Sequence, residues 1–197
     1  MSVRELVLRN RTCRRFKEDE PISMEFLREL VDLARLTPSA ANLQPLKYVL
    51  STDREMNKRI FHHLGWAAYL ADWKGPAKGE RPSAYIVVLG DKRIASNIDC
   101  DHGIAIQTML LAAVEAGYAG CILGSVAREK LRVDLGLGDE YAILLVVALG
   151  VPGEERVVDP LASDGDPKGN VKYWRDDKDV HHVPKRALDE LIVGEHA

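Results

Sequence analysis

Apolar residues recur at helical spacing in several stretches of the chain, and residues 23–36 show this most clearly. The apolar positions there lie one, three or four residues apart, at Phe26, Leu27, Leu30, Val31 and Ala34. Ser23 can cap the first turn, and Pro38 prevents the helix from continuing past the loop that follows it. The pattern therefore predicts an amphipathic helix with one face toward a core.

The same reasoning predicts the other elements of the first 150 residues. Further helices are expected over 53–65, 101–116 and 125–135, and apolar, β-branched runs predict strands over 46–51, 84–90 and 142–150. Residues 101–116 are apolar over most of their length, so this helix is expected to be buried on more than one side. Residues 120–125 read as a turn before a helix capped by Ser125.

From Val151 onward, prolines and glycines interrupt a polar stretch without sustained periodicity, which predicts a long arm or loop. Beyond it, residues 171–174 and 180–183 resemble two short strands around a polar turn, and 184–192 a last helical piece led in by Pro184. No internal repeat and no linker between two apolar cores is visible. The prediction is one α+β domain over residues 1–197.

Composition and charge argue against several classes of function. A net charge of −3 over 197 residues gives no long-range field for nucleic acid, and no apolar run is long enough for a membrane span. Three distant cysteines without a CxxC pair favour reduced thiols in the cytoplasm. The histidine pairs at 62–63 and 181–182 lack further ligands at metal-site spacing, so no metal is expected.

Four arginines nevertheless gather in residues 9–16, "RNRTCRRF". Taken alone, such a cluster is most often a solvated surface patch. Arg11, Thr12 and Arg14, however, place two guanidiniums and a hydroxyl on an extended segment where they can converge on one phosphate monoester. No glycine-rich pyrophosphate turn or P-loop is present to do this instead.

Two motifs resemble the FMN-dependent nitroreductases. Residues 11–16 are similar to the family's N-terminal Arg-x-Ser-x-Arg-x-Phe phosphate motif, and residues 38–45, "PSAANLQP", to its Pro-Ser-x-x-Asn-x-Gln-Pro loop. The resemblance implies a nitroreductase-like fold: a central, mostly antiparallel sheet flanked by helices, a long central helix at the dimer interface and an extended C-terminal arm. Asn10 stands where many members have a basic residue, and Thr12 replaces the usual serine.

Carried over to this chain, the resemblance implies a site made from both ends of the sequence. Arg11, Thr12 and Arg14 would hold the FMN phosphate and ribityl chain, joined by Arg186 and Lys185. The flavin ring would lie at a homodimer interface, between a loop of the partner subunit and a turn whose backbone approaches the ring. The residues implied are Pro38, Ser39, Ala40 and Asn42 in the loop and Ile122, Leu123 and Gly124 in the turn.

The implied reaction passes a hydride from NADH or NADPH to flavin N5 and then reduces a nitroaromatic, a quinone or a related small acceptor, so no catalytic side chain is expected. Residues 64–79 hold Trp66, Tyr69 and Trp73 among glycines and a proline. They are interpreted as an aromatic cover of the substrate pocket, with a helix presenting an aromatic core face as the alternative.

Three alternatives to this enzyme stay open at the level of sequence. The chain could bind FMN as a store or sensor, or act on non-nitro substrates as a dehalogenase-like enzyme. It could also be a flavin-free dimeric interaction module. In isolation, Asn42 and Gln44 could merely bridge a proline-bounded loop, and Gly120 and Gly124 could be ordinary turn glycines.

Overall fold

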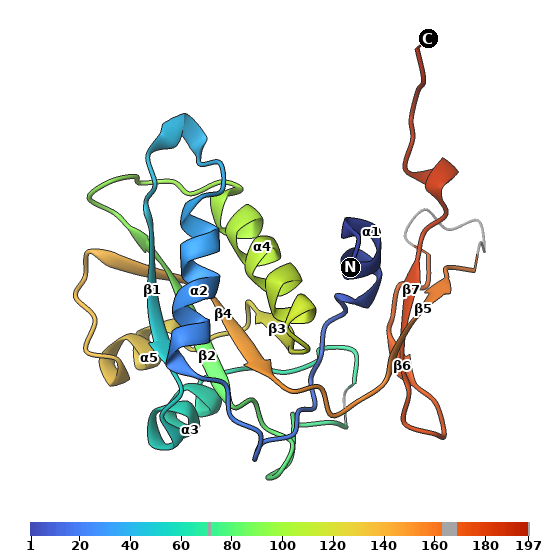
Figure 1. The fold of residues 1–197 in the computed structure, drawn as a ribbon, viewed down its shortest axis with the longest axis horizontal. Coiled ribbons are helices and arrows are strands. Elements are labelled where there is room, and N and C mark those ends of the chain that lie inside the picture. The colour runs from blue at the N-terminus through green and yellow to red at the C-terminus, as the bar shows by residue number, and fades with distance from the viewer. Residues whose placement is uncertain (71, 163–168, 197) are drawn as a thin grey trace.

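The computed structural model describes residues 1–70, 72–162 and 169–196 (Figure 1). A four-stranded antiparallel sheet in the order β1-β2-β4-β3 forms its centre. The strands are β1 (Leu46–Ser51), β2 (Ala84–Asp91), β3 (Ala119–Leu123) and β4 (Tyr141–Gly150). All eight residues of β2 are buried, as expected for a central strand covered on both faces.

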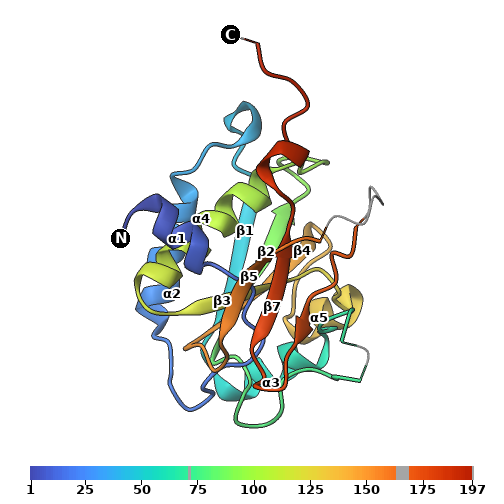
Figure 2. The ribbon, with the colours of Figure 1, turned by 90° about the vertical axis from the view of Figure 1, so that its right-hand side faces the viewer.

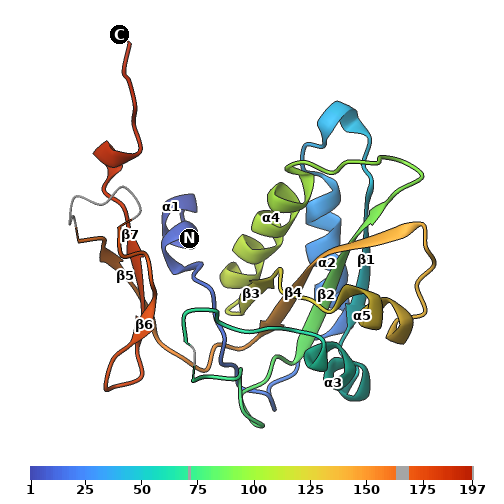
Figure 3. The ribbon, with the colours of Figure 1, turned by 180° about the vertical axis from the view of Figure 1, so that it is seen from behind.

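Alternate residues of β2 enter two separate cores. Ile86 and Val88 pack with helices α2 (Met24–Arg35) and α4 (Asp101–Glu115). Tyr85 and Val87 pack on the other face, with helices α3 (Arg54–His62) and α5 (Arg128–Asp134). The views from front and back show one helix pair on each side of the sheet (Figures 1 and 3). Because successive side chains of β2 point to opposite faces, the sheet packs against helices on both sides and the molecule has three layers.

The expected α+β architecture and most of its elements are confirmed. The Ser23 hydroxyl accepts a hydrogen bond from Phe26 N at 3.1 Å and caps α2, and the Asp53 carboxylate caps α3. Ala105, Met109 and other apolar residues of α4 are buried against the sheet. None of the helices in the described ranges is both long and apolar enough to cross a bilayer.

Two predictions around residue 120 were wrong. Residues 119–123 form strand β3 rather than a turn, because the segment pairs with the end of β4 from Ala119 opposite Gly150 onward. Ser125 does not cap α5, which begins only at Arg128. Its carbonyl instead accepts a hydrogen bond from Gly65 N at 2.8 Å, so the backbone is tied to another segment before the helix starts.

A second, smaller sheet corrects the expectation for the C-terminal part. Strand β5 (Arg156–Pro160) pairs in parallel with β7 (His181–Lys185), and β6 (Trp174–Arg175) pairs with β7 on its other side. Helix α1 (Val3–Arg9) lies between this small sheet and the central layers (Figures 1 and 3). The arm after Val151 thus contains a strand that its irregular sequence did not reveal.

The helix expected over 184–192 is reduced to one 3-10 turn, η2 (Leu188–Glu190). Pro184 belongs to β7, opposite Asp159. Proline fits there because β6 covers only the first two residues of β7, which leaves one edge of the strand without a partner among the described residues at this point. The chain then runs on to the C-terminus away from the rest of the molecule (Figure 2).

Candidate functional site

The segment after α1 is pinned by two buried side chains. Cys13 and Phe16 are 0% and 1% exposed, and Cys13 N donates a hydrogen bond to Gly120 O of β3 at 2.9 Å. Successive side chains of an extended segment point to opposite sides, so Thr12 and Arg14 face away from Cys13. Burial raises the pKa of the Cys13 thiol to about 11, so this residue packs rather than reacts.

Arg14 reaches across to the small sheet. Its Nη1 lies 3.2 Å from His181 Nε2, and its guanidinium carbon lies 4.4 Å from the centre of the Tyr173 ring. Its backbone N–H donates to the Glu154 carboxylate. No described carboxylate pairs with the Arg14 guanidinium itself. Its neighbours are the His181 ring and the face of the Tyr173 ring.

Arg11 is the second arginine of this segment whose guanidinium has no carboxylate partner in the described chain. Its Nη2 donates to Val7 O, but its Nε is buried with no hydrogen-bond partner. Burial lowers the pKa of Arg11, and the nearby charge of Arg156 lowers it further. Arg156 is a site residue that the sequence reading missed, because it lies in the stretch without periodicity.

The register of the small sheet explains how Arg156 comes there. Arg156, His181 and Arg175 are direct partners across β5, β7 and β6 and therefore point to the same face. His182 points to the opposite face, where its ring stacks on Trp174 at 4.9 Å. The two histidines thus lie on opposite faces of β7.

His181 is held neutral in the middle of this row. A guanidinium can only donate, so Nε2 accepts from Arg14 and the proton is on Nδ1, which is buried without a partner in the described chain. Burial lowers the pKa of His181 to about 4, and the charges of Arg14, Arg175 and Arg156 act in the same direction against the opposing effect of Glu154. His181 therefore orients Arg14 without adding charge.

Arg9, Asn10 and Arg15 of the same segment lie in other surroundings. Arg15 pairs with Asp179 and, at 3.6 Å, with Glu80. Arg9 is exposed at the end of α1. Asn10 Nδ2 donates to Gln107 Oε1 at 3.4 Å, so Asn10 joins the segment to α4.

The loop of the second motif is fixed by one carboxylate. Asp101, at the start of α4 and 4% exposed, accepts hydrogen bonds from Ser39 Oγ at 2.6 Å and from Ala40 N at 2.9 Å. Ser39 Oγ in turn accepts from Gln44 N at 3.0 Å. Positive φ angles occur at three loop positions that are not glycine: Ala41, Asn42 and Gln44. Such strain persists only where the surroundings determine the backbone.

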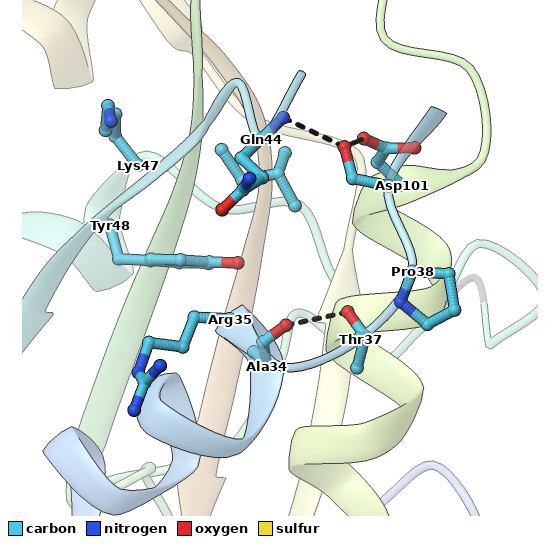
Figure 4. Close-up of a pocket in the computed structure, with 10 residues that line it drawn as sticks. Ala34, Arg35, Thr37, Pro38, Gln44, Lys47, Tyr48 and Asp101 are labelled. Atoms are coloured by element: carbon cyan, nitrogen blue, oxygen red, sulfur yellow. Dashed lines mark hydrogen bonds between the residues drawn. The ribbon is translucent and has the colours of Figure 1, made fainter. Parts of the chain in front are cut away.

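A cavity of about 240 Å³ lies beneath this loop. Figure 4 shows Tyr48 of β1 reaching into it, with Pro38 and Thr37 across from the ring. Burial, followed by the charge of Asp101, raises the pKa of Tyr48 to about 12, so its hydroxyl keeps its proton. Pro38 and Ser39 therefore form one wall of a small cavity as well as part of the loop, which includes the 3-10 turn η1 (Ala40–Asn42).

Ile122, Leu123 and Gly124 lie at the end of β3 and directly after it. The Ile122 side chain is 44% exposed, whereas Leu123 is buried in the core. A side chain at Gly124 would meet only an ordinary contact with Leu145. Gly120, in contrast, is needed for packing, because a Cβ there would come within 2.4 Å of Leu110 on α4.

The three aromatic residues of 64–79 do not gather in one place. Trp66 packs against Phe61 with ring centres 5.7 Å apart and tilted planes, and it joins the core beneath α3. Tyr69 lies 5.1 Å from Tyr173, and Trp73 lies under the Arg175 guanidinium at 4.8 Å. Residues 66–70 and 72–79 contain no helix. The segment therefore packs against the small sheet beside Arg14.

Lys185 and Arg186 follow at the far end of β7. Lys185 is opposite Pro160 and exposed, and Arg186 pairs with Glu190 at 3.2 Å. Lys185 lies four positions after His181 along the strand, a length of about 13 Å. Arg156 is the direct strand partner of His181, which contacts Arg14. Within one chain, Arg156 therefore lies nearer to this contact than Lys185 and Arg186 do.

Comparisons with known proteins identify the architecture. The family model described as "Nitroreductase family" matches residues 7–151. A protein of Archaeoglobus fulgidus named as a candidate NADH dehydrogenase/NAD(P)H nitroreductase is 31% identical over 152 residues, covering 72% of this chain and 81% of its own. A Thermus thermophilus protein named NADH dehydrogenase is 28% identical over 176 residues, covering 75% of this chain and 85% of its own.

Solved structures agree on the fold. A nitroreductase family protein of Clostridium difficile 630 superposes with a TM-score of 0.64 at 21% identity, over 78% of this chain and 86% of its own. One from Streptococcus pneumoniae TIGR4 gives a TM-score of 0.65 at 17% identity, over 82% and 95%. The fold expected from the two motifs is thereby confirmed.

Proposed function

The chain belongs to the nitroreductase family, and from this premise we propose that it binds FMN and uses NADH or NADPH to reduce a small acceptor. That it is an NAD(P)H-dependent oxidoreductase follows from the family and from relatives named NAD(P)H nitroreductase and NADH dehydrogenase. FMN and the acceptor, a nitroaromatic, a quinone or a related molecule, are the finer parts of the proposal.

The observation that carries the FMN assignment is the arginine cluster, which we define as Arg11, Arg14 and Arg156. Within the described chain, none of its guanidiniums pairs with a carboxylate, and the Nε atoms of Arg11 and Arg156 are buried without partners. A phosphate monoester offers the charge and the acceptor oxygens that these groups lack. Thr12 is exposed beside them and can donate its hydroxyl.

The bound flavin would supply the ring that takes up a hydride from the nucleotide and delivers electrons to the acceptor. In the proposal, Pro38, Ser39, Ala40 and Asn42 of a partner subunit pack on this ring, and the backbone of 122–124 approaches its edge. The loop is suited to that task because Asp101 holds it rigid. Tyr69 and Trp73 would line the acceptor side.

Apolar surface supports the proposed homodimer. Helix α1 has no buried residue, and Val3, Val7 and Leu8 are 72%, 42% and 56% exposed. Ile104 of α4 and Ile122 of β3 are exposed as well. We expect a second copy to cover these residues and static light scattering to report about twice the 21.9 kDa mass of one chain. The three free cysteines fit the proposed cytoplasmic location.

The decisive experiment replaces Arg11 and Arg14 together by alanine. Purified wild-type protein should be yellow and retain FMN, whereas the double variant should lose it, because two charge-assisted contacts are removed. Arg9→Ala is the matched control and should retain the cofactor, since Arg9 is exposed and outside the cluster. FMN affinity equal to wild type in the double variant would contradict the phosphate assignment.

Anaerobic mixing with NADH or NADPH then distinguishes the proposed enzyme from the alternative functions. NADH or NADPH should bleach the flavin absorbance of the wild-type protein, and a panel of nitroaromatics and quinones should restore it. Flavin that is bound but bleached by neither nucleotide would instead favour a storage or sensing role. Colourless protein whose melting temperature is unchanged by FMN would favour a flavin-free interaction module.

A further inference from the structure

Arg156 lies outside both motifs, yet its backbone position and its side chain bring it to Arg11. It is the first residue of β5, and its Nη1 donates to Arg11 O at 3.4 Å. Its Nε is buried and has no hydrogen-bond partner among the described residues. A donor in this state is expected only where a ligand or water completes it.

The small sheet fixes this placement. Arg156 is the direct partner of His181 in the parallel pair of β5 with β7, and His181 Nε2 accepts from Arg14. The charges of Arg156 and Arg14 both act on this histidine. The Arg11 backbone carbonyl accepts from Arg156, and the charge of Arg156 acts on the Arg11 guanidinium. Three guanidiniums from two distant parts of the sequence are therefore neighbours.

The carboxylate that accepts the backbone N–H of Arg14 already has a partner of its own. Glu154, whose side chain is 2% exposed, pairs with Arg175 at 2.6 Å and accepts the backbone N–H groups of Arg14 and Arg15. Arg175 therefore has its counter-charge, and the arginine cluster has none in the described chain. Three like charges kept together without a counter-ion disfavour one another, and a bound anion would relieve this.

We propose that Arg156 is the third guanidinium of the phosphate site and that the small sheet completes this site by presenting it. This inference rests on the proposed function, because the anion is taken to be the FMN phosphate. Arg11 and Arg14 arrive with the N-terminal segment, whereas Arg156 arrives with β5. Phosphate affinity therefore depends on the small sheet lying against that segment.

The test compares FMN with riboflavin, which has the same ring and no phosphate. Quenching of flavin fluorescence should show FMN binding weakened about 10- to 100-fold in Arg156→Gln, the effect of losing one charge-assisted contact. Riboflavin binding should be unchanged. Arg156→Lys should lie between wild type and the glutamine variant, because it keeps the charge but not the fork of donors.

Two controls separate binding from folding. Glutamine is two atoms shorter than arginine and does not reach the Arg11 carbonyl that Arg156 Nη1 contacts. Thermal unfolding of this variant is therefore measured beside its binding, and unchanged riboflavin binding shows that the flavin site is still folded. Arg54→Ala, which removes an exposed arginine at the start of α3, should change neither affinity nor unfolding. Equal losses of FMN and riboflavin binding in Arg156→Gln, or no loss of either, would overturn the inference.

The inference and the proposed function can fail separately. Wild-type protein that binds FMN no better than riboflavin would refute the phosphate assignment of the whole cluster. Wild-type protein that prefers FMN, with Arg156→Gln showing the same preference, would refute only the role of Arg156.

Discussion

The arginine cluster and the Pro38–Gln44 loop differ in how their polar groups are paired. The cluster gathers three cations and leaves them without carboxylates in the described chain. In the loop, a single buried carboxylate, Asp101, accepts from a hydroxyl and a backbone N–H and fixes a strained turn. The first region is electrostatically incomplete without an anion, and the second is complete by itself.

This difference matches the two ends of the proposed cofactor. A phosphate is bound by charge, so its site can be left with excess positive potential that the ligand neutralises. A flavin ring is bound by shape and backbone contact, so its site benefits from a rigid wall formed in advance. The variants below test whether each region depends on the residue that holds it.

The largest effect is expected for Glu154→Gln, which removes the buried counter-charge of Arg175 beside the cluster. Among the described carboxylates, Arg175 then keeps only the 3.8 Å contact with Asp179. We expect the free energy of unfolding, measured in urea, to fall by about 3 kcal/mol. Glu80→Gln, which weakens the more exposed pair with Arg15, should cost less than about 0.5 kcal/mol. Equal losses in both variants would show that burial of the carboxylate does not matter.

The next effect in size is expected for Asp101→Asn in the other region. An amide cannot accept both hydrogen bonds of the loop, so a buried donor is left unpaired at a cost of about 1–3 kcal/mol. Proteolysis should then become faster within residues 38–45 and stay unchanged in the small sheet. The matched control is Asp99→Asn, an exposed position two residues earlier. Unchanged proteolysis in Asp101→Asn would show that the loop is rigid without this carboxylate.

The last effect is a pH dependence that arises from two histidines of the small sheet. The pKa of His181 is lowered to about 4 by burial, so the unfolded chain takes up a proton first and stability falls as pH decreases from about 6.5 to about 4. The pKa of His182 is raised by Asp159, so its stabilisation is present below about pH 6.5 and lost as pH rises through the raised value.

Urea unfolding between pH 4 and pH 8 checks both slopes. His181→Gln should reduce the loss of stability on the acid side, and His182→Gln should reduce the loss on the alkaline side. The Pro38–Gln44 loop contains no histidine, so Asp101→Asn should keep both slopes. Identical acid slopes in wild type and His181→Gln would contradict the neutral, buried state assigned to His181.

Local patterns predicted the central layers well, and particular residues show why. The runs that became β1, β2 and β4 carry apolar, β-branched residues, and Ser23 and Asp53 are caps that act within one turn of their own helices. Residues 120–125 were predicted as a turn because their glycines and short length hide a strand, 119–123, that exists only through pairing with β4. Ser125 does not cap α5 because the helix begins only at Arg128, after Ala127.

The sequence by itself determined the alternation of core and surface, the helix caps, the two motifs and hence the family. These depend on neighbours within a few residues, where spacing and side-chain chemistry suffice. Only the tertiary structure decided that β5 pairs with β7, that Arg156 joins Arg11 and Arg14, and that Asp101 holds the loop. Each of these joins residues more than twenty positions apart in the sequence, where no local preference can select the partner. For β5 and β7 the register between the strands selects it.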